Sequence, residues 1–308
     1  EGYFERELAG TAGSERGVTD AHGRPLAIGE QRVEAARDGD DLVLTIDRAV
    51  QIAACDRLRQ GISTFAARGG TIVVLQPATG SVLAMCSLPN FDPDRYAEVQ
   101  DSAVYNNPAI FEAYEPGSVF KPFTLAAAVD LGLLRPQDTY EDTGEIRLGD
   151  GKRIRNADVQ AHGVQTMVEV LEKSLNTGAV YAVRIVGRES FRRYVQDFGF
   201  GRASGITLDS EVAAAISSLD RRGEIYSMTA SFGQGITVTP LQLAAAFGAL
   251  ANNGTLMRPA IVAERRQADG RVVPTQPQAV RQAVTGRTAS TITGMLVQAV
   301  EGVYDHKA

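Results

Sequence analysis

The sequence has few of the residues that bind metals or build disulfide frameworks. Its 308 residues include two cysteines and three histidines. Two cysteines are too few for a disulfide framework or a metal site, so Cys55 and Cys86 are predicted to be small buried hydrophobic side chains, the first in a helical pattern and the second in an apolar strand. His22, His162 and His306 lack the spacing of metal ligands, so we expect each on the solvated surface.

Excess positive charge and long apolar runs are also missing. The formal net charge is −6 and the pI is about 5.3, which argues against nucleic acid or another polyanion as a partner. No run of about 18 apolar residues occurs, so no membrane-spanning segment is expected within the chain. The chain opens on "EGYFERELAG", without an initiator methionine. We expect both ends to be cut from a longer protein, so the missing span says little about that parent.

What is present is an ordinary globular composition. Of the residues, 44% are hydrophobic and 22% are charged, which allows a sizeable core. Residues 1–40 are polar and Gly-rich, with a loop or short hairpin at 21–29, and resemble the tail of an upstream domain. From residue 41 onward, helices and hairpin-linked strands alternate without the regular spacing of parallel βαβ units. This pattern favours an α/β domain in which helices flank an antiparallel sheet.

Local signals place most elements of that domain. Asp47 should cap a helix that begins after it, and the Thr239-Pro240 pair should begin another. The Pro-Ala-Thr-Gly turn at 77–80 predicts a hairpin within 69–89. The remaining expected elements are a strand at 41–46, a hairpin at 144–155 with its tip at 149–151, two helical stretches within 166–187, a helix that ends at Gly199, a strand within 258–266 and a final helix at 289–303.

One helix start carries a chemical signal. In "YEPGSVFKPFTLAAAVD", which begins at Tyr114, Ser118 and Lys121 are one helical turn apart and therefore share a face. The helix N-terminus supplies positive charge beside the serine oxygen. Burial against the apolar run would lower the pKa of the lysine, so that it could serve as general base for the serine. The alternative is an N-capping serine with a solvated lysine, which any lone Ser-x-x-Lys allows.

A second polar triplet follows in "LEKSLNTGAV", where Ser174, Leu175 and Asn176 fall between two helical stretches. Here a hydroxyl could relay a proton to a leaving amine, and an asparagine could hold both Lys121 and a substrate amide. By itself the triplet could equally be a helix–helix connector with a serine N-cap.

The two motifs together are typical of penicillin-binding enzymes. With "LTIDRAVQ", "GGTIVVLQPATGSVLAM" and "GQGITVTPLQLAAAFGALANNG", they make the chain similar to the transpeptidase domain of class B penicillin-binding proteins over nearly its whole length. "YEPGS" and the compact spacing from Ser118 to Ser174 resemble the septal, FtsI- or SpoVD-like branch. "AHGRPL" resembles the end of the family's non-catalytic pedestal. The resemblance therefore divides the chain into a pedestal remnant with linker at 1–40 and a transpeptidase domain at 41–308.

The resemblance implies a function and a set of roles. Ser118 would attack a D-Ala-D-Ala stem peptide of peptidoglycan, with Lys121 as base, Ser174 as proton relay and Asn176 orienting the lysine and the donor. A neighbouring stem amine would take the acyl group, and β-lactams would acylate Ser118. No cofactor or metal is implied. A single-pass anchor outside this chain would hold the domain on the extracytoplasmic side, with a glycosyltransferase and division-complex proteins as partners.

The family's third motif, Lys-Thr/Ser-Gly, is absent. "TGRTAS" at 285–290 lacks the lysine and has the pattern of a helix start. By order, the motif should follow "VEGVYDHKA", and we expect the chain to be truncated just before it and to acylate poorly by itself. Two alternatives stay open at this point. One is a serine β-lactamase or D,D-carboxypeptidase, and the other is a non-catalytic scaffold of the division complex.

Overall fold

A computed structural model describes residues 2–16, 20–22, 24, 32–148 and 151–303. The chain divides into a smaller compact unit, made of residues 1–45, 207–209 and 260–276, and a larger one that contains the rest. The units do not coincide with the predicted boundary at residue 40, because 41–45 and 260–276 join the first. The assignment of residues 1–40 to a pedestal stays a prediction, and most of the loop predicted at 21–29 lies outside the described residues.

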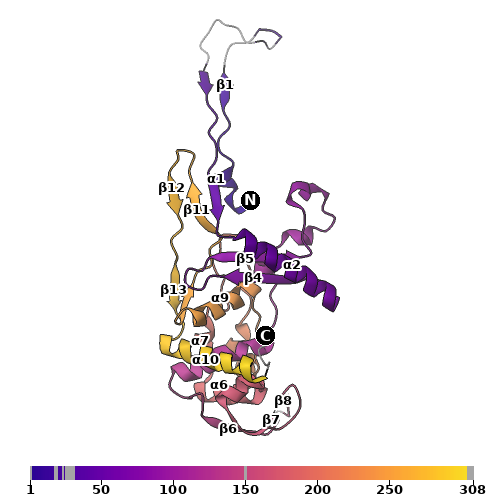
Figure 1. The fold of residues 1–308 in the computed structure, drawn as a ribbon, viewed down its shortest axis with the longest axis vertical. Helices are drawn as coiled ribbons and strands as arrows, with labels where there is room; N and C mark the ends of the chain where they lie inside the picture. Colours follow the sequence, from indigo (N-terminus) through magenta and orange to yellow (C-terminus); the bar gives the residue numbers. More distant parts are fainter. Residues whose placement is uncertain (1, 17–19, 23, 25–31, 149–150, 304–308) are drawn as a thin grey trace. The chain divides into compact units, whose positions relative to one another are not determined.

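The smaller unit is built from short antiparallel strands (Figure 1). Its elements are η1 (Gly2–Phe4), α1 (Glu5–Leu8), β1 (Ser14–Arg16), β2 (Arg32–Glu34), β3 (Asp41–Leu44), β11 (Val262–Arg266) and β12 (Val272–Pro274). β1 pairs with β2, and the other three form a sheet in the order β12-β11-β3. An ion pair of 3.3 Å between Arg265 Nε and Asp40 Oδ2 joins β11 to the residue before β3.

In the larger unit, a hairpin packs between helices. β4 (Gly70–Leu75) and β5 (Val82–Leu88) pair antiparallel, and α2 (Arg48–Phe65) contacts both strands. The predicted cap is confirmed, because the Asp47 carboxylate accepts hydrogen bonds from two amides in the first turn of α2. Gly80 in the predicted turn has a φ of +77°, a conformation that glycine adopts without steric cost.

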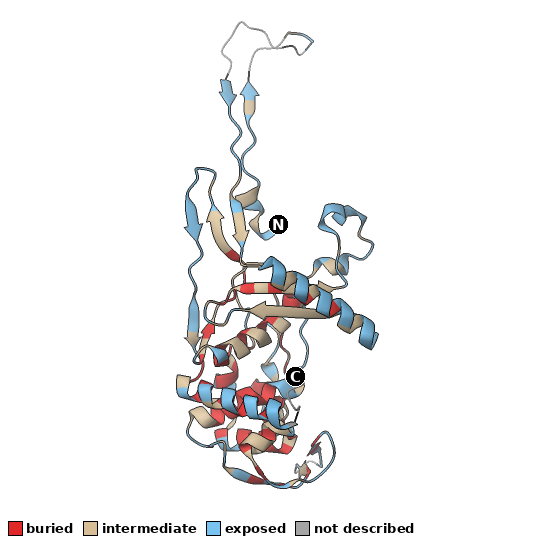
Figure 2. Ribbon diagram, in the orientation of Figure 1, coloured by how far each residue is buried: buried red, intermediate tan, exposed pale blue. Residues whose placement is uncertain are grey.

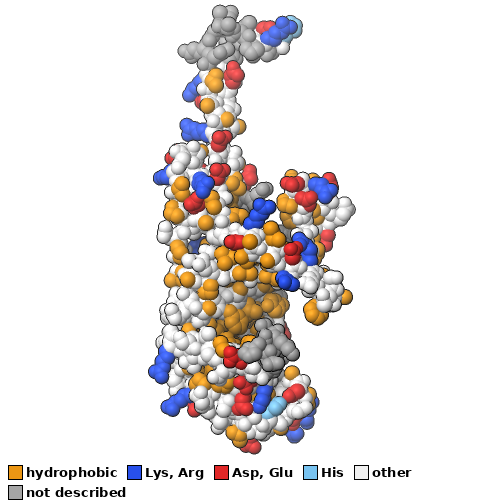
Figure 3. Space-filling view, in the orientation of Figure 1, with side chains coloured by type: hydrophobic (Ala, Val, Ile, Leu, Met, Phe, Trp, Pro, Cys, Tyr) orange, Lys and Arg blue, Asp and Glu red, His pale blue; other side chains and the backbone are white. Residues whose placement is uncertain are grey.

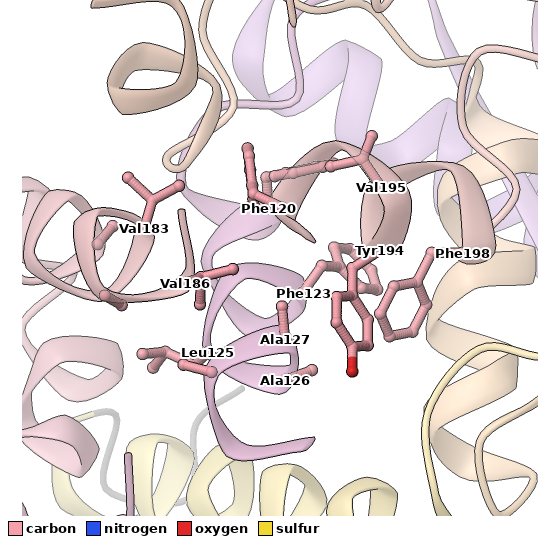
Figure 4. Close-up of a cluster of buried hydrophobic side chains, with 14 of the residues drawn as sticks. Phe120, Phe123, Leu125, Ala126, Ala127, Val183, Val186, Tyr194, Val195 and Phe198 are labelled. Carbon is pink, nitrogen blue, oxygen red and sulfur yellow. The ribbon is translucent and has the colours of Figure 1, made fainter. Parts of the chain in front are cut away.

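The remaining helices form the main core. They are α3 (Pro108–Phe111), α4 (Lys121–Asp130), α5 (Met167–Glu172), α6 (Asn176–Val186), α7 (Arg188–Asp197), α8 (Glu224–Ala230), α9 (Pro240–Ala251) and α10 (Gly286–Val303). Buried residues concentrate among them, whereas β1 and β2 are largely exposed (Figure 2). α4 lies inside this core: Phe120, just before it, and Phe123 are at most 1% exposed and pack with α6 and α7 side chains (Figure 4).

Short antiparallel strand pairs and 3-10 turns complete the larger unit. The paired strands are β6 (Thr139–Asp142) with β9 (Gly163–Thr166), β7 (Glu145–Arg147) with β8 (Arg153–Arg155), and β10 (Thr255–Met257) with β13 (Ala279–Gln282). The 3-10 turns are η2 (Pro93–Glu98), η3 (Ser102–Tyr105), η4 (Gly117–Phe120) and η5 (Ser217–Asp220). The hairpin predicted at 144–155 is confirmed, although two residues of its tip, 149 and 150, lie outside the described residues. All strand pairs described are antiparallel, as predicted.

The cysteine prediction is wrong. Cys55 on α2 and Cys86 on β5 form a disulfide, with 5.6 Å between their Cα atoms. The two residues are 31 positions apart in the sequence, and only the packing of α2 on β5 brings them together. Each was placed in the right element, but their pairing is a tertiary property that a count of cysteines does not reveal.

The surface mixes charges of both signs on the face that Figure 3 shows. Acidic and basic side chains are interspersed over the face shown in Figure 3, without a broad patch of one sign. Among the described residues, no helix combines the length and apolarity that a bilayer span requires.

Candidate active site

The predicted nucleophile lies in a tight turn at the entrance to α4. Gly117 has a φ of +64°, and residues 117–120 form the single 3-10 turn η4, which leads directly into the helix. Pro122 sits in the first turn of α4, where it costs no intrahelical hydrogen bond. Ser118 is exposed, whereas Phe120 is fully buried. The turn therefore anchors itself through an aromatic side chain and presents the serine hydroxyl to solvent.

A second segment of the larger unit holds this turn from outside. The Gly117 amide donates to the Gly233 carbonyl at 3.0 Å, and the Gly235 amide donates to Glu115 Oε1 at 2.9 Å. Gly233 has a φ of +78°, and a Cβ atom there would lie 2.2 Å from the Gly117 oxygen. Only glycine permits this approach. The Gly233-Gln234-Gly235 stretch thus fixes the backbone that carries Ser118.

Lys121 points into the protein rather than to water. The residue is 1% exposed. Its Nζ lies 2.9 Å from Ser118 Oγ, 2.9 Å from Ser174 Oγ and 2.6 Å from the Ser174 carbonyl oxygen. Burial lowers the pKa of Lys121 to about 8, because the charged form loses its hydration. A solvated lysine beside an N-capping serine, which the motif alone allowed, does not describe this geometry.

Ser174 lies in the break between α5 and α6, where its backbone has a φ of +55°. That conformation turns both the Ser174 carbonyl and its hydroxyl toward Lys121. The N-cap of α6 is Leu175. Ser174 is therefore not the N-cap that the interpretation of the triplet as a helix–helix connector required. Two serine hydroxyls therefore flank one buried amine.

Asn176 begins α6 and is partly buried. Its side-chain amide donates to the Arg155 carbonyl at 2.8 Å. In the described part of the chain no hydrogen bond joins Asn176 to Lys121, so the predicted orienting contact between them is not seen. The structure brings Ser118, Lys121 and Ser174 into one cluster and leaves Asn176 beside it, tied to the end of β8.

Sequence reasoning missed a polar cluster directly behind this segment. Asp142, Asn156 and Thr177 are each at most 3% exposed and are bonded to one another. The prediction of a solvated His162 is wrong, because its Nδ1 lies 2.7 Å from Asp142 Oδ2 and its Nε2 lies 3.0 Å from Asp158 Oδ2. The sequence held one sign of this cluster, because Thr177 directly follows the Ser174-Leu175-Asn176 triplet. His22 is exposed, as expected, and His306 lies outside the described residues.

Among residues 2–16, 20–22, 24, 32–148 and 151–303, no set of three His, Cys, Asp or Glu side chains could hold a metal ion. The chemistry that Ser118, Lys121 and Ser174 offer is a hydroxyl nucleophile, a buried amine as base and a second hydroxyl in contact with that amine. This set suits acyl transfer through a serine ester.

The chain matches a known protein family. The family model described as the penicillin binding protein transpeptidase domain matches residues 70–306. The chain belongs to this family. Stage V sporulation protein D of Bacillus subtilis is 37% identical over 265 residues, which cover 86% of this chain and 41% of that protein. A peptidoglycan D,D-transpeptidase FtsI homolog of Chlorokybus atmophyticus is 32% identical over 260 residues, 80% of this chain and 37% of that protein.

The fold of this transpeptidase domain is shared with solved structures. Penicillin binding protein 3 of Mycobacterium tuberculosis, in complex with aztreonam, superposes with a TM-score of 0.81 at 27% sequence identity, over 97% of this chain and 67% of that one. These relatives confirm the predicted class B membership and the FtsI/SpoVD-like branch. The chain spans about two fifths of the length of the curated relatives described above.

Proposed function

We propose that the protein is a serine-type peptidoglycan D,D-transpeptidase that acts in cell division and is inhibited covalently by β-lactams. One observation carries the proposal: a lysine amine that is 1% exposed lies 2.9 Å from two serine hydroxyls, one of which is exposed at a helix start. A purely structural role would not explain a buried lysine whose amine, in the described part of the chain, bonds to two hydroxyls and a carbonyl but to no carboxylate. The names of the relatives, D,D-transpeptidase among them, point the same way.

Acylation follows from the geometry. With its pKa near 8, a fraction of Lys121 is neutral at pH 7 and can take the proton from Ser118 Oγ. The serine oxygen then attacks the carbonyl carbon between the two D-alanines of a donor stem peptide. The Ser118 backbone N–H, at the start of the helix, faces the developing oxyanion. The proton moves from Lys121 through Ser174 Oγ to the leaving D-alanine amine.

Deacylation reverses the proton path. The amine of a neighbouring stem peptide attacks the Ser118 ester, Ser174 and Lys121 remove its proton, and Ser118 Oγ is restored with the new amide as the cross-link. A β-lactam presents a strained amide in place of the donor and leaves its ring-opened acyl group on Ser118. Asn176, at the edge of the cluster, would bind the donor's amide. The bound aztreonam in the Mycobacterium tuberculosis relative supports this class of inhibitor.

The Cys55–Cys86 disulfide supports an extracytoplasmic setting. Structural disulfides persist in oxidising compartments and are rare in the cytosol. We infer that the catalytic domain works on the outer side of the cell membrane, held by an anchor outside these residues, next to a glycosyltransferase and other division proteins. On the face that Figure 3 shows, acidic and basic side chains are interspersed, which is compatible with protein partners.

The test is covalent labelling of the full-length protein with a fluorescent penicillin, followed by peptide mapping with mass spectrometry. We expect one adduct, on Ser118, and none in Ser118→Ala. An adduct on Ser174, or one that survives Ser118→Ala, would show that the nucleophile is misassigned. Absence of any adduct in the folded protein would favour a non-catalytic scaffold.

The lifetime of the adduct separates the enzyme classes. A transpeptidase should keep the penicilloyl group far longer than a β-lactamase, in which water rapidly deacylates the serine. Incubation with stem pentapeptide and an amine acceptor should give the cross-linked amide in preference to the hydrolysed acid. Rapid turnover of penicillin would instead identify a β-lactamase, and exclusive hydrolysis of the peptide a D,D-carboxypeptidase.

A further inference from the structure

The start of α6 lacks the local cap that helices of this kind normally carry. The N-cap residue is Leu175, which has no side-chain acceptor, and its side chain makes no cap hydrogen bond. The first amides of a helix have no intrahelical partner and must find one elsewhere. This matters here because the same turn carries Asn176 and follows Ser174 directly.

Asn156 supplies that partner from a distant part of the chain. Its side-chain oxygen accepts a hydrogen bond of 3.2 Å from the Thr177 amide, 21 residues away. The carbonyl of the preceding residue, Arg155, accepts the 2.8 Å bond from the Asn176 side chain. Two consecutive residues at the end of β8 thus hold two consecutive residues at the start of α6, one through its backbone and one through its side chain.

Asp142 at the end of β6 fixes both sides of this connection. Its Oδ1 accepts a bond of 2.7 Å from the Thr177 hydroxyl, and its two oxygens accept bonds of 3.0 Å and 2.8 Å from Asn156 Nδ2. The Gly144 amide donates to the same carboxylate at 2.9 Å. Burial by itself would raise the pKa of Asp142, but these donors and His162 together hold it below its usual value. The carboxylate is therefore kept ionised within this buried cluster.

His162 closes the cluster toward solvent. Its amide donates to Asp142 Oδ2 at 3.1 Å, and its ring lies between that oxygen and Asp158 Oδ2. On the inner side, the Tyr140 hydroxyl lies 3.1 Å from the Thr177 hydroxyl. The amide and the hydroxyl of Thr177 thus bond to residues of β6 and of the loop after β8, so these residues set the position of the first turn of α6.

We propose that Asp142 and Asn156 are positioning residues for the Ser174–Asn176 segment, holding the proton-relay hydroxyl against Lys121 and the Asn176 amide at the edge of the site. The inference rests on the function proposed above. In the described part of the chain neither residue is hydrogen-bonded to Lys121 or Ser118, so both act through Thr177, which directly follows Asn176. Because the carboxylate and amide are almost fully buried, loss of one link leaves an unpaired polar group that water cannot readily satisfy, and the segment is expected to shift.

The most direct test exchanges the Thr177 hydroxyl. Thr177→Val keeps the shape but removes the donor to Asp142, whereas Thr177→Ser keeps the donor. With the full-length protein and a penicillin, stopped-flow measurements separate the acylation rate constant from the dissociation constant of the initial complex. We expect the Thr177→Val acylation rate constant to fall about tenfold or more, as for sub-ångström to ångström misplacement of reacting groups. Thr177→Ser should restore most of the rate.

A matched control separates positioning from simple stability. Thr288 on α10 is also a buried threonine, and its hydroxyl is bonded to Thr285. Thr288→Val should lower the melting temperature but leave the acylation rate constant unchanged well below that temperature. If Thr177→Val does not fold, Thr177→Ala leaves room for a water beside Asp142 and should fold, with the same loss of rate.

The outcomes distinguish this inference from the proposed function. A folded Thr177→Val or Thr177→Ala protein that acylates at the wild-type rate, while Ser118→Ala is inert, would overturn the positioning role alone. Labelling of Ser118→Ala would overturn the function itself. A fall in rate that Thr177→Ser does not relieve would show that the threonine methyl, and not the hydrogen bond to Asp142, sets the segment.

Discussion

The two segments that meet at Lys121 are built on different principles. The Ser118 turn is local: serine and lysine are three residues apart, and η4 continues into α4 so that both share one face. The Ser174 segment is assembled at long range. Its serine reaches a lysine 53 residues earlier, and its neighbours are held by residues 21 and 35 positions away.

This difference in construction corresponds to a difference in the proposed roles of the two segments. In the proposed function, the local segment carries the nucleophile and the base, which must keep a fixed distance, and one helical turn fixes that distance. The distant segment would carry the relay and the donor contact, which must match the substrate as well as the base. Its geometry can be adjusted by changing strands β6 and β8 without disturbing Ser118. We therefore expect changes at Lys121 to abolish reaction and changes at the second segment to weaken it.

The largest effect should come from Lys121→Arg. Guanidinium does not deprotonate in proteins, so the variant keeps the positive charge but loses the base. The penicillin acylation rate should fall by about 10³-fold or more, within the range that general acid–base groups contribute. Circular dichroism should show a folded protein. An arginine variant that acylates at a near-normal rate would exclude Lys121 as base and remove the asymmetry between the segments.

Asn176→Ala should produce the next largest loss. We expect acylation to slow by roughly 100-fold, as when a positioned polar group is removed from an acyl-transfer site. The melting temperature should change little, because Asn176 is only partly buried and makes one described hydrogen bond, to the Arg155 carbonyl. Asn90→Ala, at an exposed loop position, is the matched control. A large drop in melting temperature with unchanged acylation would make the segment a structural connector.

The pH dependence of the acylation rate should follow the titration of a single group, Lys121. Its pKa is lowered by burial to about 8, and the proposed mechanism makes the neutral amine the reactive form. The acylation rate should therefore rise about tenfold per pH unit below that value and level off above it. Rates in Asn176→Ala should be lower at every pH but follow the same profile. A bell shape with a second group titrating, or a profile that Asn176→Ala displaces, would contradict a base that acts independently of the second segment.

The same contrast explains what the sequence could predict. Local patterns identified the features that depend on contacts within a few residues. These are the Ser118–Lys121 pair, the Asp47 and Thr239 caps, and the hairpins at 69–89 and 144–155. Contacts between Ser174 and Lys121 were expected only through family resemblance. The Cys55–Cys86 bond, the enclosed His162 and the Asp142 cluster depend on packing between distant elements, which no spacing in the sequence encodes.

The region around the Cys55–Cys86 disulfide is remote in sequence from both segments. The Cys55–Cys86 disulfide closes a loop between residues separated by 31 positions, and loss of such a constraint on the unfolded chain costs about 3–4 kcal/mol of stability by the chain-entropy model. The double variant Cys55→Ala/Cys86→Ala should therefore unfold at a clearly lower temperature. Because α2 and β5 supply none of the residues around Lys121, acylation measured well below that temperature should match the wild type.

This expectation is the converse of that for Asn176→Ala, in which the acylation rate should fall while the melting temperature changes little. An acylation rate that drops with the disulfide would mean that the hairpin and α2 also set the geometry of the site. The contrast between a serine–lysine pair on one helical turn and a segment assembled at long range would then have to include a third element.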